Sequence, residues 1–270
     1  MNVTKATNNE KQAVIEFCQN TFSWGDYISQ AWDSWINEGS FLVIHDDDKP
    51  VAICHASIYK EGKQVWIEGI RVNEKFRRKG YASKLISESE KIGKQNDCDV
   101  AYMIIVSTNQ KSLDLAQKLN YDNFETWNFY SLELKKITSK PKIKFASYEK
   151  KLPSIIFSSN FFYVNSWRWL PLDNDAKLSL IKAKHIIYSE NNNTTYSVAV
   201  ISESEHFDKT LLITIISSSE NKLQEILSYI QYFAYNKNYK RIQVLTKLKF
   251  SQSHEGLENK FTFNLMKKRI

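Results

Sequence analysis

The stretch of sequence that decides the fold is IRVNEKFRRKGYA, residues 70–82. An apolar run ends at Val72, basic residues and a lone glycine follow, and a helical pattern begins at Ser83. This order predicts a strand, a turn and a helix N-terminus, where backbone N–H groups and the helix dipole favour a phosphate. Gly80, in the spacing Arg77-x-x-Gly80-x-Ala82, allows a positive φ or a close backbone approach. The segment therefore predicts a pocket for a pyrophosphate-bearing cofactor, and we expect the chain to be an enzyme.

Length and composition predict a globular protein with a substantial core. The 270 residues suffice for one large domain or two ordinary ones, and a hydrophobic content of 42% supports a packed interior. Cys18, Cys54 and Cys98 lie far apart, which indicates reduced, buried thiols rather than disulfides. No His/Cys/Asp cluster has metal-ligand spacing, so we expect no metal. No apolar run reaches 18 residues and no signal peptide is evident, so we expect a cytoplasmic protein without a membrane partner.

The net charge of +7 is unevenly distributed along the chain. Residues 1–142 contain 19 basic and 19 acidic residues, so the whole excess lies in residues 143–270. A basic surplus can attract nucleic acid or smaller anions. Lysines dominate this half and no arginine–aromatic cluster appears, so we favour a lysine-coated surface over a nucleic-acid partner.

Apolar periodicity in the first half predicts a definite order of strands and helices. Strands are predicted at residues 2–7, 41–45, 51–59, 65–72, 101–106 and through 130–132, and helices at residues 9–18, 26–37, 82–95 and 111–119. Three antiparallel strands come before a strand–helix–strand crossover, so the sheet should be mixed, with helices on both faces. The predicted fold class is α/β (α+β) with a mostly antiparallel sheet.

The second half repeats this order in a smaller α/β domain. Strands are predicted at residues 185–189, 196–201, 211–217 and 241–245, a turn at 191–193, a helix at 221–235 and a short ending at 261–267. A polar, aperiodic stretch at residues 137–145 is interpreted as a linker, which separates domains at residues 1–136 and 146–270. The joint before the second helix, residues 217–221, reads SSSEN and has neither glycine nor a basic residue. We therefore expect a similar architecture without the phosphate pocket.

Residues 65–130 resemble the GCN5-related N-acetyltransferase (GNAT) superfamily in three segments. The segment Ile70-Arg71-Val72 is similar to the family's splayed strand, whose backbone pairs with the pantetheine arm of acetyl-CoA. The run Arg77-Arg78-Lys79-Gly80-Tyr81-Ala82, followed by Ser83, matches the family's Arg/Gln-x-x-Gly-x-Gly/Ala pyrophosphate loop. Asn109 and the later Lys118-Leu119-Asn120-Tyr121 match the family's Asn…Lys-x-Gly-Phe segment, in which the asparagine lies near the cofactor. The resemblance implies acetyl-CoA as the cofactor, these residues as its binding site, and a tandem protein whose second GNAT-like half is degenerate.

Two positions depart from the family pattern. Many members place a tyrosine seven residues after the asparagine, as proton donor to the departing CoA thiolate, and this chain has Ala116 there. Asn120 replaces a glycine, which is a mild change because asparagine tolerates the left-handed conformation. The cofactor site is therefore expected to be intact while the usual general acid is missing.

Acetylation of an amine needs a base and an oxyanion donor near the splayed strand. Glu68 is the carboxylate there, within an apolar run that would raise its pKa toward a useful range. A structural Glu68 that pairs with Arg71 or a surface lysine is an equal alternative, and the neighbouring Gly69 predicts a close backbone approach or a bulge. A backbone N–H near Val72 would donate to the oxyanion.

Several aromatic and histidine residues are candidates for the acceptor site. Trp24 and Tyr27 belong to an aromatic set on one helical face where the family shapes its acceptor pocket, although core packing is the alternative reading. His55, on a neighbouring strand, could face the same cleft or be a core residue. Tyr130, on the last strand of the first half, is a candidate replacement for the missing acid.

We predict from these features an acetyl-CoA-dependent N-acetyltransferase that acts by direct transfer in a ternary complex. The acceptor would be a small-molecule amine, an amino acid or a peptide, and the protein could form a homodimer. Two alternatives stay open: a non-catalytic acetyl-CoA-binding regulatory module, and a nucleic-acid-binding protein that uses the basic second half.

Overall fold

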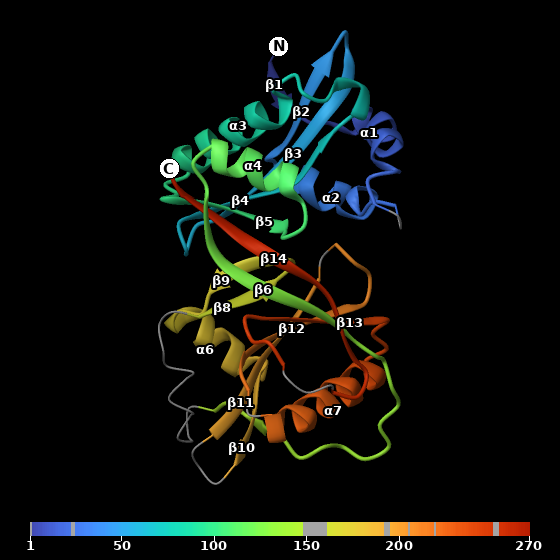
Figure 1. Ribbon diagram of the computed structural model, residues 1–270, viewed down its shortest axis with the longest axis vertical. Helices are drawn as coiled ribbons and strands as arrows, with labels where there is room; N and C mark the ends of the chain where they lie inside the picture. The colour runs from blue at the N-terminus through green and yellow to red at the C-terminus, as the bar shows by residue number, and fades with distance from the viewer. Residues whose placement is uncertain are drawn as a thin grey trace. The chain divides into compact units, whose positions relative to one another are not determined.

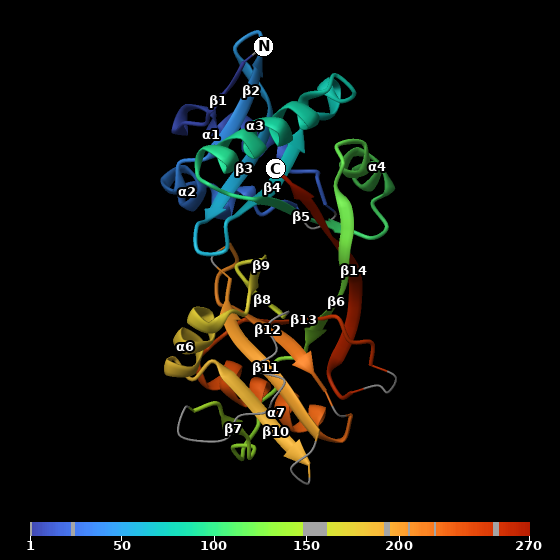
Figure 2. The same cartoon turned by 90° about the vertical axis from the view of Figure 1, so that its left-hand side faces the viewer.

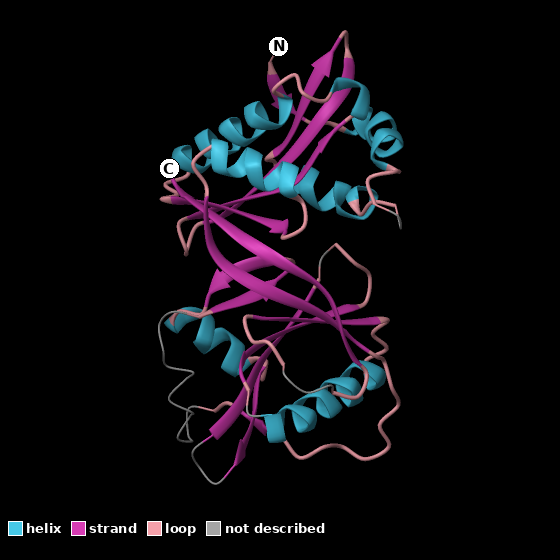
Figure 3. Cartoon of the chain, viewed as in Figure 1, coloured by secondary structure: helices cyan, strands magenta, loops and turns pink. Residues whose placement is uncertain are grey.

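The protein is described by a computed structural model that covers residues 2–22, 25–147, 161–191, 195–204, 206–218, 220–250 and 254–270. The chain forms two compact units, which are described separately (Figure 1). The first contains residues 1–125 and 264–270, and the second contains residues 126–263. Each unit combines strands with helices (Figure 3).

A mixed sheet forms the centre of the first unit. Its strands are β1 (Val3–Lys5), β2 (Phe41–Asp46), β3 (Lys49–Tyr59), β4 (Gln64–Val72), β5 (Val100–Val106) and the end of β14 (Leu257–Arg269). Strands β1 to β4 are antiparallel neighbours, β5 runs parallel to β4, and β14 lies beside β5. The alternation of side chains along these strands creates two apolar faces, each of which requires a cover.

Helices cover both of those faces. Helices α3 (Tyr81–Gln95) and α4 (Gln110–Lys118) pack against one face through residues such as Leu85, Ile86 and Leu113. Helices α1 (Lys11–Cys18) and α2 (Ile28–Glu38) cover the other, where Trp32 and Trp35 are fully buried. The predicted mixed sheet with helices on both faces is confirmed.

The second unit has a comparable sheet. Its strands are β6 (Asp122–Leu132), β7 (Lys144–Phe145), β10 (Ile186–Asn191), β11 (Thr195–Glu203), β12 (Thr210–Ser217) and β13 (Arg241–Thr246). Helix α7 (Glu220–Asn236) covers one face, and helix α6 (Asn174–Lys182) packs on the other. A hairpin of β8 (Phe162–Asn165) and β9 (Arg168–Pro171) also belongs to this unit. The sequence did not predict α6 or this hairpin, and part of the predicted turn at residues 191–193 lies outside the described residues.

The two units exchange their final strands. Residues of β6 beyond Glu125 pair with β13 of the second unit, from Asn128↔Thr246 to Leu132↔Ile242. The last residues of β14 complete the first unit, where Asn264 accepts a hydrogen bond from Ser107 at 2.8 Å. The structure therefore divides the chain after residue 125 rather than at the predicted linker, because a strand's pattern predicts its existence but not its partner. Figure 2 shows β6 and β14 from the side.

Candidate active site

Strands β4 and β5 separate after three paired positions. Their parallel register runs from Gln64↔Val100 to Trp66↔Tyr102, and over the described residues it extends no further. Strand β4 nevertheless continues to Val72 and β5 continues to Val106. From Ile67 to Val72, β4 therefore has an edge that no β5 ladder occupies, which is the splayed arrangement that the resemblance implied.

The backbone N–H of Val72 points toward this open edge. On the opposite edge of β4, the N–H of the next residue, Asn73, donates to the Val51 carbonyl of β3 at 2.8 Å. Successive N–H groups of an extended strand point to opposite edges, so the N–H of Val72 faces away from β3. A hydrogen-bond donor is thus available where the sequence placed one.

A β-bulge at Gly69 redirects the strand within the part of β4 that β5 does not pair with. The register with β3 shifts between Ile53↔Arg71 and His55↔Glu68, and Gly69 has a φ of +62°. A Cβ at this position would lie 2.3 Å from Cη2 of Trp35. Gly69 is therefore required both by its backbone conformation and by the close approach of an indole ring, and the predicted bulge is confirmed.

The basic loop leads directly into helix α3. Arg77 ends a short 3-10 helix (Glu74–Phe76), Arg78 has a φ of +65°, and Gly80 has a φ of +82°. Gly80 occupies the N-cap position and has no side chain with which to cap the helix. The first-turn N–H groups of Tyr81, Ala82 and Ser83 therefore lack an intrahelical acceptor, and open space surrounds the position of a Cβ on Gly80. This geometry fits the pyrophosphate of a nucleotide cofactor.

Two residues of the loop have structural partners. The Tyr81 side chain is buried, and its hydroxyl donates to Oδ2 of Asp46 at 2.9 Å. The Lys79 ammonium lies 3.3 Å from the same oxygen and 4.9 Å from the centre of the Phe76 ring. These contacts attach the loop to strand β2. Lys79, which the sequence assigned to the cofactor, forms an ion pair with Asp46 here.

Glu68 belongs to a compact polar cluster at the bulge. Its Oε1 lies 2.8 Å from Nδ1 of His55, which is fully buried on β3. The other ring nitrogen of His55 lies 3.6 Å from Oε2 of Glu38, at the end of α2. The same Glu38 oxygen accepts a hydrogen bond from Ser57 at 3.0 Å. The predicted neighbourhood of Glu68 and His55 is thus observed, whereas nothing in the sequence had singled out Glu38.

Trp35 fixes the orientation of the imidazole. Its indole stacks on the His55 ring, with centroids 4.8 Å apart and an interplanar angle of 10°. An ionised carboxylate only accepts hydrogen bonds, so Nδ1 of His55 carries a proton whenever Glu68 is ionised. His55 is therefore held as a donor to Oε1 of Glu68.

Arg71 uses its side chain within the protein. The guanidinium donates to both carboxylate oxygens of Asp26, at 2.6 and 3.1 Å, and to the Ile70 carbonyl at 3.0 Å. It also lies 5.3 Å from the centre of the Tyr27 ring. Burial raises the pKa of Tyr27 to about 12, so its hydroxyl stays protonated near neutral pH. Asp26 is thus the bidentate carboxylate partner of Arg71.

The remaining predicted residues occupy different places. Asn109 caps helix α4 by accepting from the Ser112 N–H at 3.3 Å, and Ala116 is buried in the core beneath that helix. Tyr130 lies in the second unit, where it packs against Phe250, whereas Glu68 belongs to the first unit. Trp24 lies outside the described residues.

The corresponding joint of the second unit is closed. Strands β12 and β13 remain paired over six positions, from Thr210↔Arg241 to Ile215↔Thr246. A register shift at residue 216 against β11 parallels the bulge of β4. The second unit therefore keeps the bulge but lacks, over its described residues, both the opened edge and the glycine loop.

Comparison with known proteins identifies the family of the first unit's domain. Residues 11–121 match the acetyltransferase (GNAT) family. These residues form a GNAT acetyltransferase domain. The family uses acetyl-CoA as acetyl donor, which agrees with the resemblance in the loop and the splayed strand. None of the curated proteins matched the sequence.

Solved structures of similar fold extend over the whole chain. A candidate acetyltransferase from Thermoplasma acidophilum has a TM-score of 0.66 and 14% identity, with complete coverage of both chains. A GCN5-related N-acetyltransferase from Sphaerobacter thermophilus has a TM-score of 0.64 and 10% identity, covering 99% of this chain and 95% of that one. At these identities the likeness concerns the fold alone. It covers the second half of the chain as well as the GNAT domain.

Membrane-spanning helices and metal clusters are both absent from the described residues. No helix there is both long and apolar enough to cross a membrane. No group of three His, Cys, Asp or Glu side chains in the described ranges is arranged to hold a metal ion.

Proposed function

We propose that the first unit transfers an acetyl group from acetyl-CoA to a primary amine, directly and within a ternary complex. The observation that carries this proposal is the position of Glu68, which lies one residue before the bulge and on the part of β4 whose edge β5 leaves open. A base and a backbone donor thus lie on the same short segment of strand. The second half would be a further GNAT-like domain that has no cofactor site of its own.

The cofactor would be held by the open edge and the basic loop. Arg77, Arg78 and the first-turn N–H groups of α3 would bind the pyrophosphate, and the backbone from Ile70 to Val72 would pair with the pantetheine arm. Asn109 would border the same site from the start of α4. When bound, acetyl-CoA supplies the acetyl group as a thioester whose carbonyl carbon can be attacked by an amine.

Glu68 would act as the general base. An acceptor that arrives as an ammonium would give one proton to the Glu68 carboxylate, which leaves the nitrogen lone pair available for attack. His55 would position this carboxylate through its contact with Oε1, and Trp35 would hold the His55 ring. The N–H of Val72 would donate to a carbonyl oxygen placed at the open edge, as oxyanion-hole donors do.

The acceptor is proposed to enter beside Tyr27, His55 and Glu68. Because Asp26 already occupies the Arg71 guanidinium, we do not assign Arg71 to an acceptor carboxylate. A protonated amine suits a surface that includes Glu68 and Glu38. The proposed acceptor class is a small amine, an amino acid amine or a peptide N-terminus, and cytoplasmic location and a homodimer remain predictions.

The experiment is a screen of amines, amino acids and peptides for release of the CoA thiol by the full-length protein. We expect Glu68→Gln to lower kcat about 100-fold or more while the affinity for acetyl-CoA, measured by calorimetry, stays unchanged. Glu88→Gln, which removes a surface carboxylate paired with Lys91, is the matched control and should keep wild-type turnover. Tight acetyl-CoA binding without thiol release from any acceptor would instead favour the non-catalytic module.

A further inference from the structure

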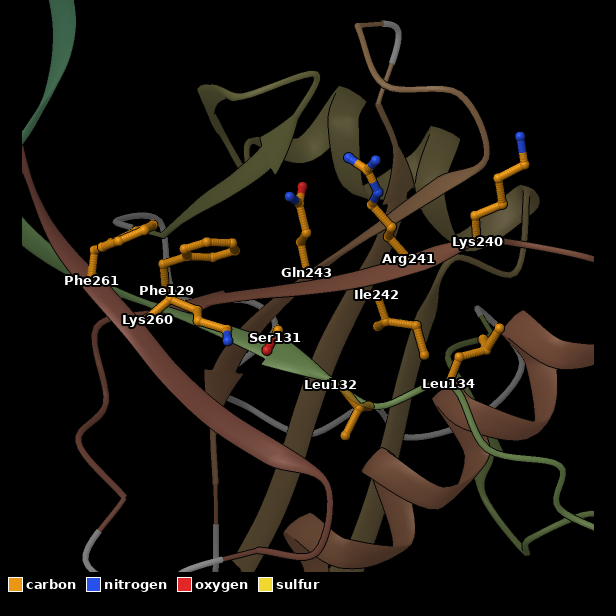
Figure 4. A pocket seen from close by; sticks show the side chains of 10 residues that line it. All are labelled: Phe129, Ser131, Leu132, Leu134, Lys240, Arg241, Ile242, Gln243, Lys260 and Phe261. Atoms are coloured by element: carbon orange, nitrogen blue, oxygen red, sulfur yellow. The ribbon is translucent and has the colours of Figure 1, made fainter. Parts of the chain in front are cut away.

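A recess of about 380 Å³ lies within the second unit and shares no residue with the proposed cofactor site (Figure 4). Residues of β6, β13 and β14, together with neighbours of these strands, line it, and all of them belong to residues 126–263. This volume falls at the lower end of the range for small-molecule sites, which is roughly 300–1,000 Å³. The recess is therefore large enough for a compact organic molecule.

Cross-strand register places its polar groups on one face of the sheet. Gln243 is paired with Ser131, so their side chains share a face, and Arg241 shares it because it lies two residues from Gln243. Figure 4 shows Arg241 and Gln243 projecting from the same side of β13. Residues two apart on a strand are separated by about 7 Å, so these two groups could contact opposite ends of one ligand.

The side-chain oxygen of Gln243 is a hydrogen-bond acceptor without a donor among the described residues. Its Oε1 is buried, and among the described residues it has no hydrogen-bond partner. A buried acceptor without a donor costs free energy, and a ligand with an N–H or O–H would remove that cost. This atom therefore points to a ligand that donates.

The charges around the recess differ in whether they have carboxylate partners. Lys240 is paired with Asp208 at 2.6 Å, and Lys260 is paired with Glu258 at 2.5 Å. For Arg241, by contrast, no carboxylate of the described residues lies within ion-pair distance. A guanidinium binds a carboxylate, sulfonate or phosphate through two parallel hydrogen bonds. The balance of charge therefore favours a ligand with a single negative group.

Aromatic surface supplies the rest of the recess. Phe129 and Phe261 stack with centroids 5.7 Å apart, and Phe261 is 50% exposed. Leu134, at another point of the lining, is 38% exposed. Large apolar side chains exposed beside a recess are typical of ligand-binding surfaces.

We propose that the second unit binds a small monoanionic acid that has an aromatic or otherwise apolar body and one N–H or O–H donor. The anion would pair with Arg241, the donor would bind Oε1 of Gln243, and the apolar body would lie against Phe129 and Phe261. The site is separate from acetyl transfer, and its existence does not depend on the activity of the first unit.

The test uses 8-anilinonaphthalene-1-sulfonate, which combines a sulfonate, an N–H and an apolar body. We expect one saturable fluorescence site per full-length chain, and it should persist with saturating acetyl-CoA. Arg241→Gln should weaken binding about tenfold or more, because it removes the charged partner. Arg269→Gln, an exposed arginine of the first unit, is the matched control and should leave the affinity unchanged.

Two related probes separate the contribution of the sulfonate to binding from that of the N–H donor. N-phenyl-1-naphthylamine lacks the sulfonate and should bind weakly, with no sensitivity to Arg241→Gln. Naphthalene-1-sulfonate lacks the anilino N–H and should be insensitive to Gln243→Leu, whereas the anilino sulfonate should lose affinity. Thermal melting of each variant checks that it is folded. Equal binding to wild type and Arg241→Gln, tight binding of the uncharged amine, or displacement by acetyl-CoA would each overturn the proposal.

Discussion

Substitution of Gly69 by alanine tests how the bulge and the polar cluster depend on each other. An alanine must adopt a φ of +62°, which costs about 1–2 kcal/mol for a residue with a Cβ. The new methyl must also displace Trp35, whose Cη2 and Cζ3 lie 2.3 and 2.5 Å from its ideal position, and such overpacking costs about 1–3 kcal/mol. We therefore expect Gly69→Ala to lower the free energy of unfolding by about 2–5 kcal/mol.

The assay is urea unfolding followed by far-ultraviolet circular dichroism, and Gly39→Ala is the matched control. Gly39 ends helix α2 with a φ of +80°, and a Cβ there meets nothing within 4 Å. This control contains the conformational cost alone, about 1–2 kcal/mol, so the difference between the variants isolates the collision with Trp35. If both variants lose the same stability, the packing argument is refuted.

A double variant tests the identity of the colliding group. Trp35→Phe removes the far edge of the indole, so Gly69→Ala should cost less in that background than in wild type. The same displacement should disturb the stacking of Trp35 on His55 and lower turnover through Glu68, even though Gly69 has no side chain at the site. Strictly additive losses of stability would show that Trp35 is not the obstacle.

Three further predictions concern the buried ion pair, the cofactor loop and pH. Asp26→Asn should lower the free energy of unfolding by about 3 kcal/mol in urea titrations, because it leaves the Arg71 guanidinium buried without its counter-charge; a loss below about 1 kcal/mol would contradict this. Arg78→Gln should raise the Kd for acetyl-CoA about tenfold in calorimetry, with a smaller change in kcat, and an unchanged Kd would remove Arg78 from the cradle. Burial raises the pKa of Cys54 from 9.0 to about 12, so the unfolded thiol ionises first and stability should fall as pH rises from about 9 toward 12. Urea titrations at stepped pH measure this slope, which Cys54→Ala should flatten.

Much of the first unit could be predicted because its sequence signals are local. The apolar run that ends at Val72, the glycine at position 80 and the helical period that follows belong to one contiguous stretch, and each has a single sensible structure. Gly69 likewise predicted a bulge, since glycine within a strand commonly marks one. The reason for that glycine, the indole of Trp35, lies in another helix and could not be read from its neighbours.

Long-range pairing accounts for what the sequence did not predict. Asp26 and Arg71 are 45 residues apart, and Glu38 meets His55 only because the end of α2 lies over β3. The strand that contains Tyr130 was predicted correctly, but its pairing with β13 moves Tyr130 into the second unit, which alternation alone cannot reveal. The hairpin at Phe162–Pro171 was not predicted because its strands are only four residues long.

The exchange of final strands also has a consequence for synthesis on the ribosome. Strand β5 is made before the segment that lies beside it in the sheet, residues 264–270, because residues 126–263 are translated between them. At about 5–20 residues per second, the free edge of β5 waits roughly 7–30 seconds while residues 126–263 are translated. During that interval the unpaired backbone of β5 is open to association with other chains, which makes the nascent protein a candidate client for chaperones. The first unit therefore cannot be completed until the second unit has been translated.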